Sequence, residues 1–174
     1  MKVGIVGLGL IGGSMAKSIK TRTAHTVYGI DLDHETMTMA RMCGAIDAPL
    51  TDENLPACDL VLVAIRPGAA VAWVQAHADK IAKSAILVDL CGVKRTVVEA
   101  LAPIAEAHGF AYMGGHPMAG THFSGFKYSR ADLFDGAPMV LVPPTFDDIR
   151  LLDRAKKLLA PVGFGRVSIT TADK

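Results

Sequence analysis

Short apolar runs alternate along the chain with longer segments in which apolar residues recur at helical spacing. The short runs predict strands at residues 3–6, 26–30, 59–65, 85–90, 110–113, 138–142 and 166–170. The longer segments predict helices at residues 11–20, 34–43, 69–81, 96–108 and 146–159. Between these elements, residues 45–46 fit a further short strand, and residues 118–136 are expected to form a loop that includes at most a short helix.

This regular alternation predicts an α/β fold with a doubly wound, mostly parallel sheet and helices on both of its faces. The strand from Asp59 to Ile65 supports a sheet that is covered on both faces, since nearly all of its residues are apolar. Neither an internal repeat nor a linker divides the chain, so residues 1–174 are expected to fold as one domain.

The composition excludes several classes of protein. Hydrophobic residues make up 51% of the chain and charged residues 20%, which excludes a disordered protein. The formal net charge of +1, without any block of like charges, gives nucleic acid no electrostatic footprint. No apolar run approaches the roughly 18 residues of a membrane span, so no membrane partner is expected. Three widely spaced cysteines (Cys43, Cys58 and Cys91) suit a reducing compartment, and we expect a cytoplasmic protein.

A glycine-rich turn joins the first predicted strand to the first predicted helix. Its sequence, Gly7-Leu8-Gly9-Leu10-Ile11-Gly12, matches the dinucleotide-binding fingerprint of Rossmann-type domains. The first glycine allows the tight turn, the second lets the backbone approach a pyrophosphate, and the third lets the helix pack closely on the strand. The N–H groups at the start of the helix would bind the phosphates. Residues 7–12 are therefore candidate cofactor-binding residues, together with Ala64 and Ile65 at the end of another strand.

Asp31 ends the second predicted strand, 19 residues after Gly12. This is close to the spacing of about 20 residues at which the fingerprint places an acidic residue. A carboxylate here accepts hydrogen bonds from the adenosine ribose hydroxyls and repels a 2′-phosphate. Residues 31–40 contain no Arg or Lys that could bind such a phosphate, which favours NAD over NADP as the cofactor. The alternative is a structural turn beside an exposed aspartate, and Asp33 is expected to cap the helix that follows.

His116 is the strongest candidate for a catalytic side chain. It follows two glycines beyond the strand at residues 110–113, at the edge where open α/β sheets bind ligands. Held by the following Pro117, its imidazole could act as a general base or polarise a hydroxyl group. A structural histidine is the alternative.

The other ionisable side chains suggest no competing chemistry. His25, His34, His77 and His108 are expected to contact solvent. The His, Cys, Asp and Glu residues do not show the spacing of a metal site, so no metal is expected. Cys91 is expected to be buried or to line a site rather than to be a reactive thiol.

Further motifs carry a resemblance to a known family. They are Asp89-Leu90-Cys91-Gly92-Val93-Lys94, Gly114-Gly115-His116-Pro117-Met118-Ala119-Gly120 and Leu133-Phe134-Asp135-Gly136-Ala137. With the glycine-rich turn and Asp31, and most specifically in the run around His116, the sequence resembles the prephenate dehydrogenase family of tyrosine biosynthesis over essentially its whole length. The resemblance implies an oxidoreductase that converts prephenate to 4-hydroxyphenylpyruvate by oxidative decarboxylation, with NAD taking the hydride.

The resemblance also implies roles for particular residues. His116 matches the family's catalytic histidine and would accept a hydrogen bond from the ring hydroxyl of the substrate. Cys91, Gly92, Thr121 and His122 would contact the substrate. Cys91-Gly92 departs from the Gly-Ser of many members, and His122 from their acidic residue. These departures concern substrate recognition more than the reaction.

Family members continue into a helical domain that forms a homodimer and supplies basic residues for the substrate carboxylates. The chain ends about where that domain would begin, so we expect residues 1–174 to be the NAD-binding part. Alone, it is expected to bind NAD but to turn over prephenate poorly or not at all. Two alternatives stay open: an arogenate or cyclohexadienyl dehydrogenase, and a domain that senses NAD without catalysis.

Overall fold

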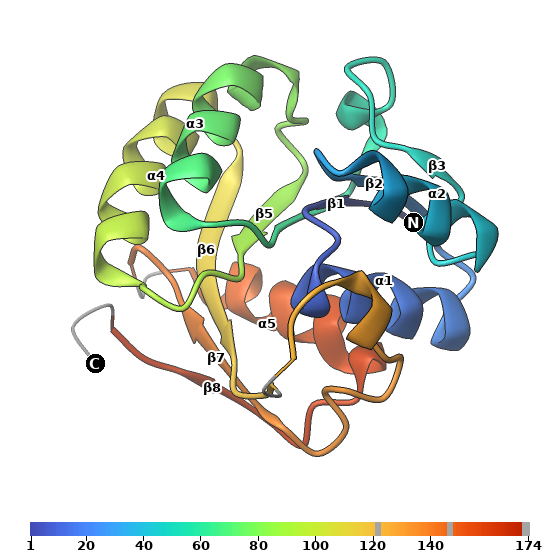
Figure 1. Ribbon diagram of the computed structural model, residues 1–174. Helices are drawn as coiled ribbons and strands as arrows, with labels where there is room; N and C mark the ends of the chain where they lie inside the picture. Colours follow the sequence, from blue (N-terminus) through green and yellow to red (C-terminus); the bar gives the residue numbers. More distant parts are fainter. Residues whose placement is uncertain (121–122, 146–147, 172–174) are drawn as a thin grey trace.

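The computed structural model describes residues 1–120, 123–145 and 148–171. Within these residues, eight strands form one sheet in the order β3-β2-β1-β4-β5-β6-β7-β8 (Figure 1). Neighbouring strands are parallel except for β6 and β7, which are antiparallel. The strands are β1 (Lys2–Val6), β2 (Thr26–Ile30), β3 (Ala48–Pro49), β4 (Leu60–Val63), β5 (Ile86–Asp89), β6 (Ala111–Pro117), β7 (Pro138–Val142) and β8 (Arg166–Ile169). The helices are α1 (Leu10–Arg22), α2 (His34–Met42), α3 (Pro67–His77), α4 (Arg95–His108) and α5 (Ile149–Leu159), with short 3₁₀ helices η1 (Leu55–Ala57), η2 (Ala78–Lys80), η3 (Phe126–Tyr128) and η4 (Ala160–Val162).

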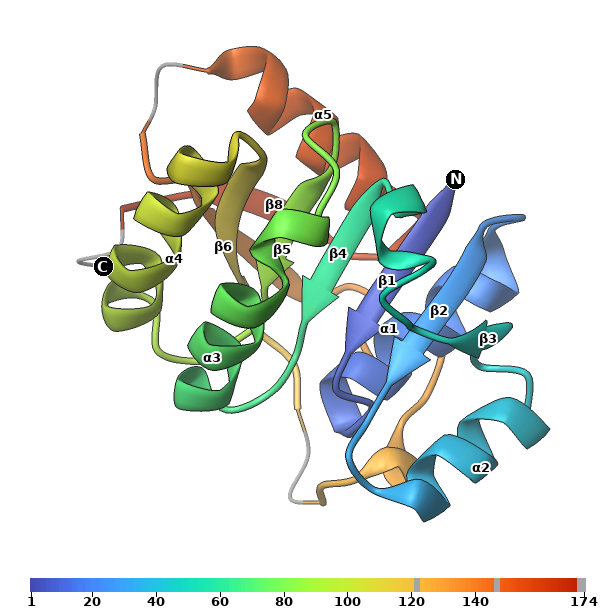
Figure 2. The ribbon, with the colours of Figure 1, turned by 90° about the horizontal axis from the view of Figure 1, so that it is seen from above.

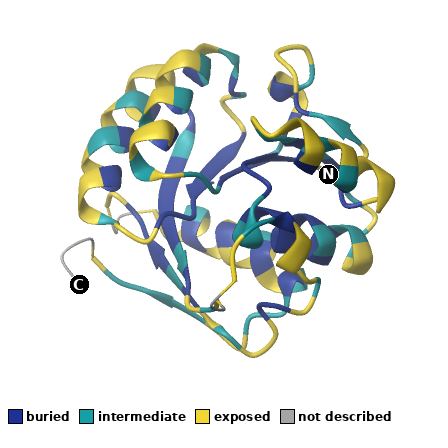
Figure 3. Cartoon of the chain, viewed as in Figure 1, coloured by how far each residue is buried: buried dark blue, intermediate teal, exposed yellow. Residues whose placement is uncertain are grey.

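Helices cover both faces of the sheet, as the sequence predicts (Figure 2). α1, α2 and α5 lie on one face, where Met15, Ala40 and Leu152 join one core. α3 and α4 lie on the other face, where Val74 and Leu101 join a second core. The strands at the centre of the sheet are buried (Figure 3). In β4 all four residues are buried, because its side chains alternate between the two cores. The fold is the doubly wound, mostly parallel α/β architecture that the alternation of elements predicts.

Several local signals in the sequence are confirmed. β2 and β7 have the predicted bounds. α4 ends at Gly109, which has a φ of +78°, a conformation that favours glycine. Asp33 caps α2: its carboxylate accepts hydrogen bonds from the backbone N–H (3.2 Å) and the hydroxyl (2.6 Å) of Thr36.

The prediction of a strand at residues 45–46 is wrong. Ala45 and Ile46 are buried, but their N–H groups donate to the carbonyl of Ala40 as the chain leaves α2. The strand that pairs with β2 is β3, two residues further on. The apolar pair Ala45-Ile46 therefore indicated burial rather than strand pairing.

α5 begins later than the sequence pattern suggests. It starts at Ile149, after Asp148, whose carboxylate accepts a hydrogen bond from the N–H of Leu151 (2.9 Å). The predicted start at residues 146–147 lies outside the described residues. No helix in the described part of the chain is both long and apolar enough to cross a membrane.

β6 is longer than predicted and includes His116, so the prediction that this histidine lies beyond the end of the strand is wrong. The pairing of β6 with β5 ends where Gly114 lies opposite Asp89. From Gly115 to Pro117, β6 pairs only with β7, and His116 lies opposite Val140. The antiparallel β7 extended the strand beyond the point at which the glycines suggested that it ends.

Proline fits this strand because of the side on which its nitrogen lies. The N–H of Met118 donates to the carbonyl of Pro138 in β7 (2.8 Å). Since alternate residues of a strand face the same neighbour, His116 directs its backbone groups toward β7, and Pro117 has its nitrogen on the opposite side. The strand therefore needs no donor from Pro117.

Candidate cofactor and active site

The glycine-rich turn between β1 and α1 has the close contacts that its sequence predicts. Gly7 has a φ of +92°, and a Cβ there would overlap the carbonyl oxygen of Ala64. A Cβ on Gly12 would overlap the carbonyl oxygen of Gly7, so glycine lets α1 start close to β1. The Cβ position of Gly9 instead has no atom of the described residues within 4 Å. The turn is therefore tight at Gly7 and Gly12 and open at Gly9, where a pyrophosphate would approach.

Hydrogen bonds hold the carboxylate of Asp31 against this turn. Asp31 accepts from the backbone N–H of Leu8 (2.8 Å) and from that of Asp33 (2.9 Å). The N–H of Gly7 also donates to the carbonyl of Ile30 (2.8 Å). Each carboxylate oxygen has further lone pairs, so the half-buried Asp31 can still accept hydrogen bonds from a ligand.

A pocket of about 790 Å³ lies beside the carboxyl ends of β1, β2 and β4, and we call it the nucleotide pocket. Five of the predicted cofactor residues line it, namely Gly7, Gly9, Asp31, Ala64 and Ile65. The other four do not: Leu8 and Gly12 are buried, and Leu10 and Ile11 pack against the core at the start of α1. The structure thus brings the turn, the acid and the end of β4 together around one cavity.

α3 contributes pocket residues that no sequence motif indicates. Arg66, its N-cap residue, lines the nucleotide pocket, as do Trp73 and His77 on the helix. The rings of Trp73 and His77 stack, with centroids 4.3 Å apart. The expectation that His77 simply contacts solvent is therefore incomplete. The signal in the sequence is the i, i+4 spacing of two aromatic rings on a predicted helix.

The loop after β5 contacts the wall of the same pocket. Cys91 is buried, as expected, and its thiol donates to the carbonyl of Ile65 (3.3 Å). Burial and the neighbouring Asp89 carboxylate raise the pKa of the Cys91 thiol to about 11, so it stays protonated at neutral pH. Beside it, the Cβ position of Gly92 has no described atom within 4 Å.

A buried charged cluster fixes this loop. Asp89 forms an ion pair with Lys94 and accepts hydrogen bonds from the hydroxyl of Tyr112 (2.6 Å) and the N–H of Cys91 (3.1 Å). Burial and the Asp89 carboxylate raise the pKa of Tyr112, so its hydroxyl remains a donor. Because Lys94 is engaged at the end of the loop, it is not free to bind the carboxylates of a substrate.

His116 lies on the face of the sheet that carries this cluster. Alternate residues of a strand share a face, so His116 is on the same side of β6 as Gly114 and Tyr112. A Cβ on Gly114 would lie 3.2 Å from the Lys94 side chain and 3.4 Å from the Asp89 carboxylate. The half-buried His116 therefore lies just beyond the cluster, at the carboxyl end of β5. Thr121 and His122, also predicted for this site, lie outside the described residues.

The segment that follows β6 returns to α1. The ammonium group of Lys17 donates to the carbonyl of Ser129 (2.8 Å) and lies 4.5 Å from the ring centroid of Phe126. The hydroxyl of Ser14 accepts a hydrogen bond from the N–H of Arg130 (3.0 Å). Residues 126–130 are thus attached to the helix whose N-terminus faces the nucleotide pocket.

Known proteins share this arrangement. Residues 15–168 match the family model described as prephenate dehydrogenase, nucleotide-binding domain. The prephenate dehydrogenase of Bacillus subtilis is 30% identical over 160 residues, which are 89% of this chain and 43% of that protein. Among solved structures, arogenate dehydrogenase from Synechocystis has a TM-score of 0.88 at 27% identity. Prephenate dehydrogenase from Aquifex aeolicus, in complex with hydroxyphenyl propionate and NAD⁺, has a TM-score of 0.86 at 27% identity.

The similarity covers nearly all of this chain but only part of its relatives. The two solved structures match 99% of this chain, which covers 60% of each of them. The chain therefore spans about two fifths to three fifths of the length of these relatives.

Proposed function

Because this chain belongs to the prephenate dehydrogenase family, we propose that it is the NAD-binding, histidine-bearing part of an enzyme that oxidatively decarboxylates prephenate. The observation that carries the proposal is the nucleotide pocket, in which the glycine-rich turn and Asp31 meet. The family match begins at residue 15, so the turn supports nucleotide binding independently of that match.

The residues present fit NAD. The open space at Gly9 and the N-terminus of α1 would bind the pyrophosphate, and Asp31 would accept hydrogen bonds from the adenosine ribose. A 2′-phosphate would lie against the Asp31 carboxylate, which favours NAD over NADP. Residues 31–40 contain no Arg or Lys, but Arg66, from another segment of the chain, lines the same pocket with a positively charged side chain. The charge of Asp31 at the ribose decides the preference in this proposal.

His116 is the proposed catalytic residue. Its imidazole would accept a hydrogen bond from the ring hydroxyl of prephenate and take up the proton as the hydroxyl carbon becomes a carbonyl. NAD, when bound, supplies the hydride acceptor. Aromatisation drives the loss of the ring carboxylate as carbon dioxide, so the chain mainly has to orient the ring and polarise the hydroxyl. The hydrogen bond between Cys91 and Ile65 supports this role, since it joins the loop beside His116 to the wall of the nucleotide pocket.

Arogenate is the second candidate substrate, because the Synechocystis structure with a TM-score of 0.88 is an arogenate dehydrogenase. Prephenate and arogenate differ only in a keto or amino group on the side chain. The rates of NADH formation with the two compounds, measured on the protein as its gene encodes it, distinguish the two proposals.

The decisive variant is His116→Asn. We expect kcat to fall by roughly 10²- to 10⁴-fold, the usual contribution of a general base. The Kd for NAD should not change, because His116 is not a residue of the nucleotide pocket. The fluorescence of Trp73, the single tryptophan of the chain and a residue of that pocket, reports this Kd. Unchanged turnover in the His116→Asn variant of the whole protein would leave His116 without a catalytic role, as expected for a domain that senses NAD without catalysis.

A further inference from the structure

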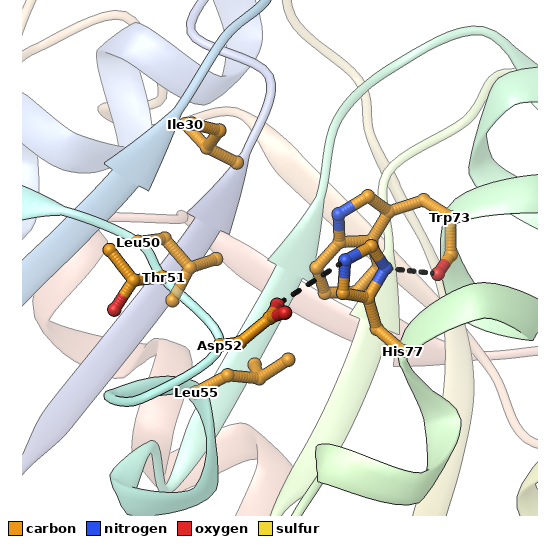
Figure 4. A pocket seen from close by; sticks show the side chains of 7 residues that line it. All are labelled: Ile30, Leu50, Thr51, Asp52, Leu55, Trp73 and His77. Carbon is orange, nitrogen blue, oxygen red and sulfur yellow. Dashed lines mark hydrogen bonds and ion pairs between the residues drawn. The ribbon is translucent and has the colours of Figure 1, made fainter.

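A smaller pocket of about 200 Å³ adjoins the nucleotide pocket (Figure 4). Ile30, Trp73 and His77 line both cavities. The other residues of the smaller pocket are Leu50, Thr51 and Asp52, which follow β3, and Leu55, the first residue of η1. Ile30 directly precedes Asp31, the carboxylate proposed to bind the adenosine ribose. The base attached to that ribose would therefore have this smaller pocket beside it.

Two hydrogen-bond acceptors, on His77 and Asp52, lie close together in the smaller pocket, which the hydroxyl-bearing Thr51 also lines. Nδ1 of His77 lies 2.8 Å from the carbonyl oxygen of Trp73. A carbonyl can only accept, so Nδ1 carries the hydrogen, and Nε2 of the neutral imidazole is an acceptor. Nε2 lies 3.7 Å from a carboxylate oxygen of Asp52, which is longer than a hydrogen bond (Figure 4). These two acceptors face each other across a gap that a shared donor would fill.

An exocyclic amino group is such a donor, because its two N–H bonds can reach two acceptors at once. The 6-amino group of adenine lies at the edge of a flat ring whose apolar faces suit Trp73 and Leu50. We propose that the smaller pocket recognises this amino edge in the bound dinucleotide, with Asp52 and His77 as the acceptors. The inference rests on the proposed function, since it takes NAD as the ligand of the adjoining pocket.

The proposal predicts discrimination between two bases. Hypoxanthine carries a carbonyl oxygen where adenine carries the amino group, and this oxygen would face two acceptors. A site that hydrogen-bonds one group disfavours an analogue that lacks it, because its polar groups lose their partner. Asp52 is largely exposed, with 61% of its side-chain surface accessible, so water softens the effect. We expect about ten-fold weaker binding of the hypoxanthine dinucleotide than of NAD.

The test is a calorimetric titration of the full chain with NAD and with nicotinamide hypoxanthine dinucleotide. In Asp52→Ala, NAD should bind more weakly and the two dinucleotides should differ by less than about two-fold. Asp79→Asn is the matched control, since it removes the same charge near His77 from a residue outside both pockets. It should retain the ten-fold discrimination. Thermal unfolding of each variant establishes that it is folded.

Two results would overturn the inference while NAD still binds. One is equal affinity of the wild-type chain for the two dinucleotides. The other is an Asp52→Ala variant that keeps the full discrimination, which would place recognition of the base elsewhere. A chain that binds neither dinucleotide would contradict the proposed function itself, so the two failures can be told apart.

Discussion

The backbone N–H of Leu8 donates a 2.8 Å hydrogen bond to the carboxylate of Asp31. This bond joins the glycine-rich turn to the end of β2, two segments that lie 23 residues apart in the sequence. Asp31 therefore has a structural role, since it holds the turn by a hydrogen bond, and a proposed binding role, since its remaining lone pairs can accept from the ribose. Experiments on Asp31 need one variant that keeps the hydrogen bond to the turn and one that does not.

Replacing Asp31 by arginine should reverse the cofactor preference. The variant loses the acceptors for the ribose hydroxyls and gains a cation for a 2′-phosphate. We expect the Kd for NAD to rise roughly ten- to a hundred-fold and NADP to become the better ligand. Asp31→Asn is the control: it removes the negative charge, but its amide oxygen can still accept the hydrogen bond from the N–H of Leu8 that holds the turn. An Asp31→Arg chain with the wild-type ratio of NAD to NADP affinity would contradict the assignment of Asp31.

Alanine at two glycines of the turn should separate folding from binding. At Gly12 the new methyl group would overlap the Gly7 carbonyl, and such overpacking costs about 1–3 kcal/mol, more than alanine contributes by helix propensity. The Tm of Gly12→Ala should therefore fall by several degrees. Gly9→Ala has room, so its Tm should stay close to wild type while its affinity for NAD falls. Scanning calorimetry and Trp73 fluorescence give the two measurements, and equal loss of Tm in both variants would be the contrary result.

The buried pair of Asp89 and Lys94 should behave as a unit. Asp89→Asn or Lys94→Met alone leaves one charge in the interior without its partner, which costs about 3–5 kcal/mol. The double variant leaves neither charge and should be destabilised by clearly less than the sum of the two single changes. Urea unfolding of the four chains measures this coupling. Additive losses would show that the two groups are not energetically paired.

Asp47 should make the stability of the β2 edge depend on pH. Burial alone would raise the pKa of Asp47, but hydrogen bonds from the N–H of Val27 (2.7 Å) and the ammonium of Lys20 (2.9 Å) outweigh it and lower the pKa. A lowered pKa in the folded state adds stability above the unfolded value of about 3.9, and this is lost as the pH falls through the folded value. Asp47→Asn should therefore be less stable than wild type at pH 7, and the gap should close below about pH 4. A constant gap in Tm would contradict this.

Serine at Gly92 should improve turnover of the proposed substrate. The resemblance of the sequence to the family implies a serine at this position in many members, and the Cβ position of Gly92 has no described atom within 4 Å, so the side chain fits. Its hydroxyl would give the substrate hydroxyl a further partner near His116. We expect Gly92→Ser to raise kcat/KM several-fold without changing the Kd for NAD, and Gly92→Ala, as the control, to leave both unchanged. A lower kcat/KM in the serine variant would show that the cysteine–glycine pair has its own way of contacting the substrate.

The sequence predicted those parts of this molecule that depend on local chemistry. The glycine-rich turn, Asp31 and the cap at Asp33 each follow from one residue type at one spacing, and the structure has them where they are expected. Their assembly into one pocket with Ala64 and Ile65 follows from the rule that parallel strands end at the same edge.

The errors have the opposite origin, in contacts between distant segments. β6 extends through His116 because β7 pairs with it, and β7 begins 22 residues after that histidine. Ala45 and Ile46 are apolar because they are buried, and periodicity alone does not distinguish burial from strand pairing. Trp73 and His77 become pocket residues only because α3 packs beside the end of β2, and their i, i+4 spacing indicates that the two rings can stack but not that they line a pocket.

The contacts of residues 126–130 with α1 connect the two proposed binding sites structurally. The same helix offers its N-terminus to the cofactor and holds, through Lys17 and Ser14, the chain that leads away from His116. If closing this segment over a substrate tightens α1 around the pyrophosphate, thermodynamic reciprocity requires bound NAD to tighten the substrate by the same factor. Each of the two ligands would then bind more tightly in the presence of the other, whichever binds first.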